Sequence, residues 1–386
     1  MKRKIAFLLI ITLVLGLFAG CKRNEDDFSV SGSYAENEQV IGGNEDSDDT
    51  DNGSKEETPT PGTSQDKEDD SSQNQQNQKP QQTPSEPEQE NSDSAKDEEQ
   101  EPEQEQEQEE EAPVGEGGGP LYNASENPYK DSLKILAFGN SFSKDAMQHL
   151  WDIAKDYGVK TVILGNLNIG GCSLKQHYEN MNQNAAVYAY TKNTSGTWET
   201  SKNFTAEAGL ADEDWDIITI QQASDQNADS GTYNQLGDIL NYLERKKPSK
   251  DTKILWHMTW AYQSDSKKAA FEKYGYNQIK MYEALLKRAK NDVLFYDNFA
   301  GVIPVGTAIQ NVRKTSVGDT LTRDGYHLSY GMGRYIAALT WYCYITGADP
   351  EDTEYAPTED QAEIYLHHDE IKKAVADAIR NPYEIT

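Results

Sequence analysis

Three residues of the chain have the types and spacing that acyl transfer uses. Ser141 lies in the segment 139–143, Gly-Asn-Ser-Phe-Ser, directly after the apolar run 133–138. Asp324 and His327 belong to the segment Asp-Gly-Tyr-His near the C-terminal end. A strand that delivers a serine into a tight turn opening a helix places the hydroxyl at the carboxyl edge of a sheet. An aspartate on a short turn can hold a histidine against that serine, so the pattern predicts a serine hydrolase.

The predicted chemistry follows from the weakness of a serine hydroxyl as a nucleophile. His327 would accept its proton and later protonate the leaving group, and Asp324 would orient the imidazole. The developing oxyanion needs fixed donors, which the backbone N–H groups of Ser141 and Gly171 would supply. Each residue alone has a plainer interpretation, because serine is a favoured helix cap and glycine and Asp-Gly pairs form ordinary turns. Their order along the chain favours catalysis.

The elements that must position these residues are five short apolar segments separated by helical patterns. They predict one α/β domain, a three-layer α/β/α sandwich around a five-stranded parallel sheet. The expected strands are 133–138, 160–167, 216–221, 253–258 and 293–296. The expected helices are 144–157, 233–245, 269–289, 329–346 and 359–378. Residues 186–205 alternate aromatic and polar side chains, which predicts a small β-hairpin insertion.

The sequence segments around the predicted catalytic residues resemble those of a known family. The Gly-Asn-Ser turn at Ser141, Gly171 after the second strand, and the C-terminal pair Asp324 and His327 resemble the SGNH, or GDSL-type, hydrolases in order and spacing. The Gly-Asn-Ser opening and the Gln-Gln-Ala-Ser segment 221–224 are similar to a bacterial subgroup of that superfamily. The resemblance covers the whole domain. It implies a flavodoxin-like sheet, an esterase and a serine-histidine-aspartate triad.

Two positions depart from the pattern of that superfamily. Asn140 replaces the usual aspartate, and we expect its side chain to brace the turn by hydrogen bonds. The third strand should end in Gly-x-Asn, whose amide helps to bind the oxyanion, and the chain offers Gln222 or Ser224 instead. The third oxyanion donor is therefore expected to be one of these two residues.

Aromatic residues near the predicted site bear on the substrate. Trp260 and Tyr262 follow the fourth strand, and Tyr326 lies inside the Asp-His turn. Their rings would stack on sugar rings, or they are simply packing residues in a tyrosine-rich domain. We expect an ester on a small molecule or polysaccharide, with an O-acetyl group on carbohydrate as the first choice. The alternatives are a non-catalytic glycan-binding or solute-binding lipoprotein with the same fold, and a lipase or thioesterase that prefers longer acyl chains.

The N-terminus predicts export. A basic segment, 1–4, precedes an apolar run, 5–19, that is shorter than a typical membrane-spanning helix. The run ends in Leu-Phe-Ala-Gly before Cys21, which resembles the lipobox of bacterial lipoproteins. The resemblance implies a signal peptide, 1–20, and a lipid on Cys21 that anchors an extracytoplasmic protein to a bacterial membrane. The plainer alternative is an ordinary signal peptide with a chance cysteine.

A long acidic segment, 21–119, follows the predicted signal. It is rich in Glu, Asp, Gln, Ser, Asn and Pro, and it has too few aliphatic residues to offset the entropy of folding. We expect a disordered, self-repelling tether, with a cation-binding or partner-binding tail as the alternative. The chain has 66 acidic against 36 basic residues and a net charge of -30, which argues against nucleic acid as a partner. The remaining residues, 120–386, form the predicted hydrolase domain.

Neither a metal nor another cofactor is expected. His367 and His368 are adjacent on a predicted helix and point to different faces, and the other histidines lack the spacing of metal ligands. Cys172 and Cys343 are expected to be unpaired buried thiols.

Overall fold

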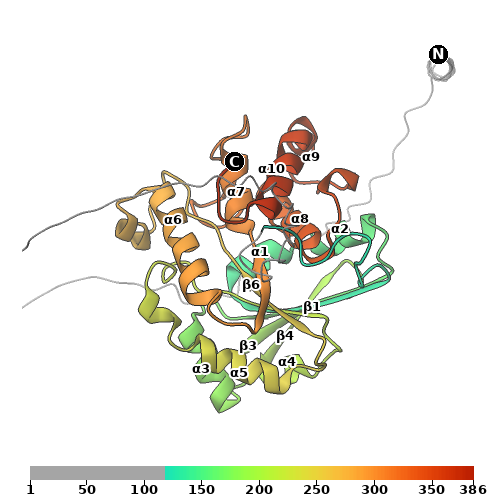
Figure 1. Cartoon of the computed structure of the whole chain (residues 1–386), viewed down its shortest axis with the longest axis vertical. Helices are drawn as coiled ribbons and strands as arrows, with labels where there is room; N and C mark the ends of the chain where they lie inside the picture. The colour runs from blue at the N-terminus through green and yellow to red at the C-terminus, as the bar shows by residue number, and fades with distance from the viewer. Residues whose placement is uncertain (1–117) are drawn as a thin grey trace, which may run out of the picture. The chain divides into compact units, whose positions relative to one another are not determined.

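The computed structural model describes residues 118–386. The predicted signal peptide, the lipidation site Cys21 and nearly all of the predicted tether lie outside these residues. The described part of the chain forms a sheet between two layers of helices, which confirms the predicted α/β/α sandwich (Figure 1). Within it, no helix combines the length and apolar character needed to cross a membrane.

Seven strands make up the sheet, in the order β4-β3-β2-β1-β5-β6-β7. Five of them run parallel: β1 (Ser132–Gly139), β2 (Thr161–Asn168), β5 (Ile217–Ile220), β6 (Lys253–His257) and β7 (Phe299–Ile303). The second parallel strand in the chain precedes the first in the sheet, and the others follow in order, which is the flavodoxin-like arrangement. The order reverses between β1 and β5. Doubly wound sheets leave a crevice at such a point, outside the carboxyl ends of the strands.

The fifth parallel strand was predicted in the wrong place. Residues 293–296 begin with the last residue of a π-helical turn, Ala289–Val293, that continues α6 (Gln278–Arg288), and β7 begins only at Phe299. Val293 is fully buried as the end of this helical segment. A short apolar run cannot be assigned to strand or helix by its periodicity alone, and here the helix continued into it.

The predicted hairpin is present, and it extends the sheet. It consists of β3 (Tyr188–Asn193) and β4 (Trp198–Phe204), joined through Gly196 at φ +93°. The two strands are antiparallel, and β3 also pairs antiparallel with β2. The insertion therefore adds two strands to the five predicted ones and places β4 at the edge of the sheet.

Helices cover both faces of the sheet (Figure 1). One layer contains α3 (Leu174–Gln183), α4 (Ala206–Leu210) and α5 (Leu236–Lys246). The other contains α1 (Ser141–Met147), α2 (Leu150–Asp156), α6, α7 (Val305–Arg313), α8 (Met332–Thr346), α9 (Gln361–Leu366) and α10 (His368–Arg380). Every residue of α7 and α8 is buried, and α8 is apolar nearly all round, as expected of a helix inside a core.

Three predicted helices are divided, and three α-helices of the described residues lie outside the predicted helix ranges. The segment 144–157 forms α1 and α2, and 359–378 forms α9 and α10. The segment 269–289 begins as a 3₁₀ helix, Ala269–Tyr274, which ends at Gly275 with φ +63° before α6 starts. Those outside the predicted ranges are α3, α4 and α7, of which α7 directly follows β7.

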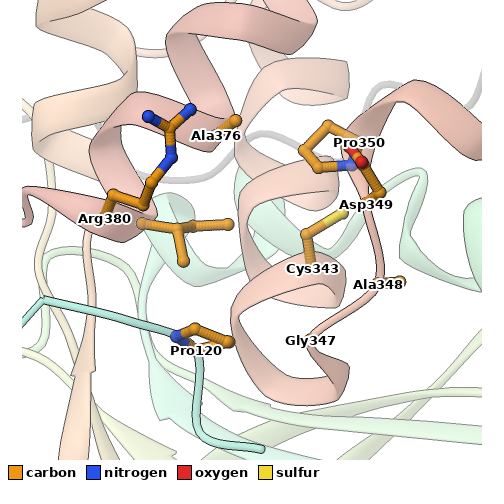
Figure 2. Close-up of a pocket in the computed structure, with 9 residues that line it drawn as sticks. Pro120, Cys343, Gly347, Ala348, Asp349, Pro350, Ala376 and Arg380 are labelled. Atoms are coloured by element: carbon orange, nitrogen blue, oxygen red, sulfur yellow. The ribbon is translucent and has the colours of Figure 1, made fainter. Parts of the chain in front are cut away.

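A cavity of about 270 Å³ lies at the C-terminal end of α8, where Pro120, Cys343, Pro350 and Arg380 line it (Figure 2). It contains none of the residues predicted to be catalytic. Cys343 and Cys172 are both buried and free, as expected. Burial raises the pKa of the Cys172 thiol to about 12 and also raises that of Cys343, so neither is a thiolate nucleophile at neutral pH.

Candidate active site

The turn between β1 and α1 presents Ser141 at the switch point of the sheet. Asn140 caps α1: its Oδ1 accepts from the N–H of Phe142 at 2.9 Å, and its Nδ2 donates to the carbonyl of Cys172 at 3.1 Å. The Nε2 of Gln221, at the end of β5, donates to the same Oδ1 at 3.0 Å. These bonds tie the serine turn to the loops after β2 and β5, which is the bracing expected of Asn140.

A chain of hydrogen bonds joins the three predicted catalytic side chains. The Nε2 of His327 lies 2.8 Å from the Oγ of Ser141, and its Nδ1 lies 2.7 Å from the Oδ2 of Asp324. The backbone N–H of His327 donates to Oδ1 of Asp324 at 2.8 Å. Partial burial raises the pKa of Asp324, but these bonds from His327 outweigh it and hold that pKa below its ordinary value. Asp324 therefore stays ionised and fixes the imidazole with Nε2 toward the serine.

The Asp-His turn is a small closed loop attached to the segment after β6. Thr322 and Leu328 bridge its ends, and the N–H of Arg323 donates to the carbonyl of His327 at 2.9 Å. Gly325 has φ +89°, and a Cβ there would lie 3.0 Å from the Oγ of Ser266. The indole N–H of Trp260 donates to the carbonyl of Tyr326 at 2.7 Å. The turn is thus held by backbone geometry and by contacts distant in sequence.

Two backbone N–H groups beside the serine are free. Those of Ser141, at the start of α1, and Gly171, in the loop after β2, donate to no acceptor within residues 118–386. The adjacent loop is closed by the N–H of Cys172, which donates to the carbonyl of Ile169 at 3.1 Å. Free N–H groups of this kind are the usual donors to a tetrahedral oxyanion.

Comparison with known proteins identifies the family. Residues 134–377 match the model of a family described as a domain of unknown function, DUF4886. The chain belongs to this family. The crystal structure of a DUF4886 family protein from Bacteroides uniformis is 37% identical in sequence, with a TM-score of 0.63. That similarity covers 66% of this chain and 98% of the Bacteroides protein.

The DUF4886 domain is also similar to two more distant solved structures. One is a protein from Slackia heliotrinireducens proposed to be an SGNH hydrolase, at 21% identity and a TM-score of 0.37, over 55% of this chain and 99% of that one. The other is a lipase/acylhydrolase from Enterococcus faecalis, at 15% identity and a TM-score of 0.37, over 56% and 96% of the two chains. The chain matches no curated protein.

Sequence reasoning missed Asp145, which joins the two halves of the site. This carboxylate is only 1% exposed and lies on α1, one turn after Ser141. Its Oδ2 accepts from the N–H of Leu328 at 3.0 Å and from Nη1 of Arg323 at 3.0 Å, and its Oδ1 accepts from Nε of Arg334 at 2.8 Å. In the DUF4886 domain these bonds fix the position of α1, which carries Ser141, relative to the turn that carries His327. An acidic residue in a short helix carries no sequence signal for such a role.

The two expected third donors of the oxyanion hole differ in their surroundings. Both amide hydrogens of Gln222 are used, because Nε2 donates to the carbonyl of Thr232 at 2.9 Å and to its Oγ1 at 3.1 Å. Its Oε1 accepts from the N–H groups of Leu174 and Ala223. Gln222 thus braces three loops and has no N–H left for a substrate, which corrects that expectation. Ser224 is partly exposed, with its Oγ 2.9 Å from the hydroxyl of Tyr262.

The aromatic side chains predicted to stack on sugars also differ in their exposure. Trp260 and Tyr262 are both 0% exposed, and the Trp260 ring stacks on Phe142 with centroids 4.3 Å apart. Neither ring offers a free face, so the structure supports packing for these two residues and corrects the stacking prediction. Tyr326 is partly exposed beside His327, with ring centroids 4.0 Å apart. Its predicted contact with substrate stays a prediction.

A buried histidine lies behind the serine turn. The Nδ1 of His257 is 2.8 Å from Oε1 of Gln221, whose amide nitrogen bonds to Asn140. Burial lowers the pKa of His257 to about 3, so its ring is neutral, and Nδ1 donates to the glutamine oxygen. The chain from His257 through Gln221 to Asn140 therefore supports the turn without adding charge to it.

Replacing Gly171 with alanine should impair both folding and activity. Gly171 has φ +61°, where an L-residue costs about 1–2 kcal/mol, although a Cβ would meet no atom within 4 Å. We expect the free energy of unfolding to fall by about 1 kcal/mol and ester turnover to fall by roughly tenfold or more, because the N–H shifts away from the oxyanion. Urea denaturation and ester hydrolysis would measure the two effects.

Gly170 provides the matched control. A Cβ at Gly170 also meets nothing within 4 Å, but its φ lies outside the left-handed region. Gly170→Ala should therefore change stability and turnover little. Equal effects of the two substitutions would contradict a special role for the backbone of Gly171.

Proposed function

We propose that the DUF4886 domain is a serine esterase that uses Ser141 as nucleophile, His327 as general base and acid, and Asp324 as the group that orients the histidine. The observation that carries the proposal is the continuous chain of hydrogen bonds, 2.8 Å from Ser141 to His327 and 2.7 Å from His327 to Asp324. Free N–H groups of Ser141 and Gly171 beside it support the assignment.

The reaction would proceed in two steps. The Oγ of Ser141 attacks the ester carbonyl carbon while its proton passes to Nε2 of His327. The tetrahedral oxygen is held by the N–H groups of Ser141 and Gly171, with the Ser224 hydroxyl as the remaining candidate for a third donor. The C–O bond to the alcohol breaks, and His327 returns the proton to the leaving oxygen. Water then attacks the acyl-enzyme with His327 again acting as base, which releases the acid and restores Ser141.

The proposed substrate is an O-acetyl group on carbohydrate. Support comes from the partly exposed Tyr326 beside His327, and from the ammonium of Lys268, 4.1 Å from the centre of the Tyr326 ring. Aromatic and polar groups of this kind suit a sugar ester better than a long acyl chain. With the lipid on Cys21 expected from its sequence, the enzyme would act outside the cytoplasm, anchored to a bacterial membrane and reaching its substrate on the acidic tether.

A fluorophosphonate probe tests the proposed function directly. The full-length protein should be labelled once, on the peptide that contains Ser141, and labelling should be prevented by prior heat denaturation. The same preparation should hydrolyse p-nitrophenyl acetate faster than the octanoate ester, and should release acetate from an acetylated polysaccharide. A protein that is neither labelled nor active on any ester would be a binding protein with this fold. Faster turnover of the octanoate would instead indicate a lipase or thioesterase.

A further inference from the structure

A second feature of the site is a polar cavity between α1 and the inserted hairpin. Its volume is about 230 Å³, which is below the roughly 300–1,000 Å³ of pockets for drug-sized ligands and suits one ring-sized group. Helix α1 and its C-cap contribute two long polar side chains, and the strands contribute three short polar side chains and one indole. These lining residues are Lys144, Gln148, Asn166, Thr191, Trp198 and Thr200.

On the side formed by the sheet, the cavity is lined by a row of polar residues that lie opposite one another on three neighbouring strands. Asn166 of β2 is directly opposite Thr191 of β3, and Thr191 is directly opposite Thr200 of β4. Residues opposite one another in neighbouring strands share a face of the sheet. The Oγ of Ser143, on α1, donates to Oδ1 of Asn166 at 3.1 Å, so the row faces α1. Without the hairpin, only Asn166 of this row would exist.

One side-chain amide that lines the cavity and one beside it have N–H groups without an acceptor among the described residues. The Oδ1 of Asn166 accepts from Ser143, and its Nδ2, which has no acceptor among the described residues, is not among the fully buried atoms, so a ligand in the cavity can reach it. Two residues further along the same face of β2, the Nδ2 of Asn168 is buried and also has no partner within the described part of the chain. Buried amides are nearly always hydrogen-bonded, and those that are not call for a ligand or water.

The cavity also has a cation and an aromatic wall. Lys144 is exposed and takes part in none of the ion pairs formed within residues 118–386. The indole N–H of Trp198 donates to the carbonyl of Gln148 at 3.4 Å, which attaches the hairpin to the end of α1. Trp198 is partly exposed, so part of its ring remains free for a ligand.

The position of the cavity relates it to the nucleophile. Lys144 and Gln148 follow Ser141 at three and seven residues along α1 and its cap, so they lie on the same face of the helix. The cavity therefore begins about one helical turn, roughly 5 Å, from the level of Ser141. On β2, Asn168 is opposite Gly139, two residues before the serine, and continues the polar row toward it. A group bound in the cavity is within reach of an ester carbonyl at Ser141.

We propose that this cavity binds a sugar ring that carries a carboxylate, as the carbohydrate part of the ester cleaved at Ser141. Amides and hydroxyls of Asn166, Thr191 and Thr200 match the hydroxyls of such a ring. Trp198 covers its apolar face, and Lys144 pairs with the carboxylate. This inference rests on the proposed function for its catalytic meaning, because it assigns the substrate class of the same site. The binding itself is independent of catalysis.

Binding of unesterified sugars tests the cavity alone. The full-length protein would be titrated with methyl glucuronide and with methyl glucoside by ligand-observed NMR at low salt. Methyl glucuronide should bind more tightly, and Lys144→Gln should weaken its binding about tenfold while changing the glucoside little. Lys202→Gln is the matched control, because Lys202 is exposed on β4 and does not line the cavity. Equal binding of the two sugars, no binding of either, or equal losses in the two lysine variants would overturn the proposal.

Hydrolysis separates a failure of this inference from a failure of the proposed function. The quantity to compare is kcat/KM for acetylated methyl glucuronide divided by kcat/KM for acetylated methyl glucoside. The ratio should exceed one in the wild type and should fall about tenfold in Lys144→Gln, but not in Lys202→Gln. An active enzyme with a ratio of one in all three proteins would leave the esterase standing and reject the subsite. Sugar binding without turnover of any ester would reject the esterase and retain the subsite.

Discussion

Replacing Ser141 with alanine should lower the turnover of p-nitrophenyl acetate by roughly 10⁴-fold or more. Without the hydroxyl there is no acyl-enzyme, and what remains is the small contribution of the oxyanion donors and of substrate binding. Ser141 is the first residue of α1 and is partly exposed, so the loss of its oxygen should leave the fold intact. Initial rates at neutral pH, with circular dichroism to confirm folding, would measure the effect.

His327 should behave as part of the same unit. We expect His327→Ala to lose activity to a similar extent, and the double variant Ser141→Ala with His327→Ala to be no worse than either alone, because both changes remove one proton-transfer chain. Ser230→Ala changes an exposed serine in the 3₁₀ helix Ser230–Tyr233 and should keep full activity. If Ser141→Ala retained more than a tenth of the wild-type rate, Ser141 would not be the nucleophile.

Removing the carboxylate of Asp145 should be the most destabilising single change in the site. Asp145→Ala leaves Arg334 and Arg323 without their shared partner, and their side chains are only 11% and 24% exposed. Breaking a buried pair by deleting one partner typically costs about 3–5 kcal/mol, and the partial exposure of the arginines favours the lower end. We expect the free energy of unfolding to fall by about 3 kcal/mol in urea denaturation.

A loss of catalysis beyond the loss of stability would show that Asp145 also positions the site. At a temperature where Asp145→Ala is fully folded, fluorophosphonate labelling of Ser141 should still be slower than in the wild type. The reason is that Leu328, next to His327, loses its hydrogen bond to α1. Asp225→Ala, at an exposed carboxylate in the loop after β5, should change neither stability nor labelling. A folded Asp145→Ala protein with wild-type stability and labelling would refute the coupling of α1 to the histidine turn.

Local patterns predicted most of the sheet and failed where tertiary packing decided. The run 133–138 is apolar on both faces after Lys134, and it forms β1 at the centre of the sheet, as a strand buried on both sides should. The run 293–296 has a similar composition, but it lies at the end of a helical segment, and β7 starts at Phe299. The two runs differ in what packs against them, and a window of four to six residues carries no information about that packing.

The same distinction between local pattern and tertiary packing holds for the candidate site. The sequence by itself determined that Ser141 would follow the first strand, and that Asp324 and His327 would share a turn, because these features depend on neighbouring residues and on backbone conformation. Only the tertiary structure decided that Gln222 is committed to Thr232, that Trp260 and Tyr262 are buried, and that the hairpin forms a cavity beside α1. It also decided the role of Asp145, which contacts residues more than 170 positions away. Such contacts are set by how layers pack, and packing involves side chains that no local sequence pattern connects.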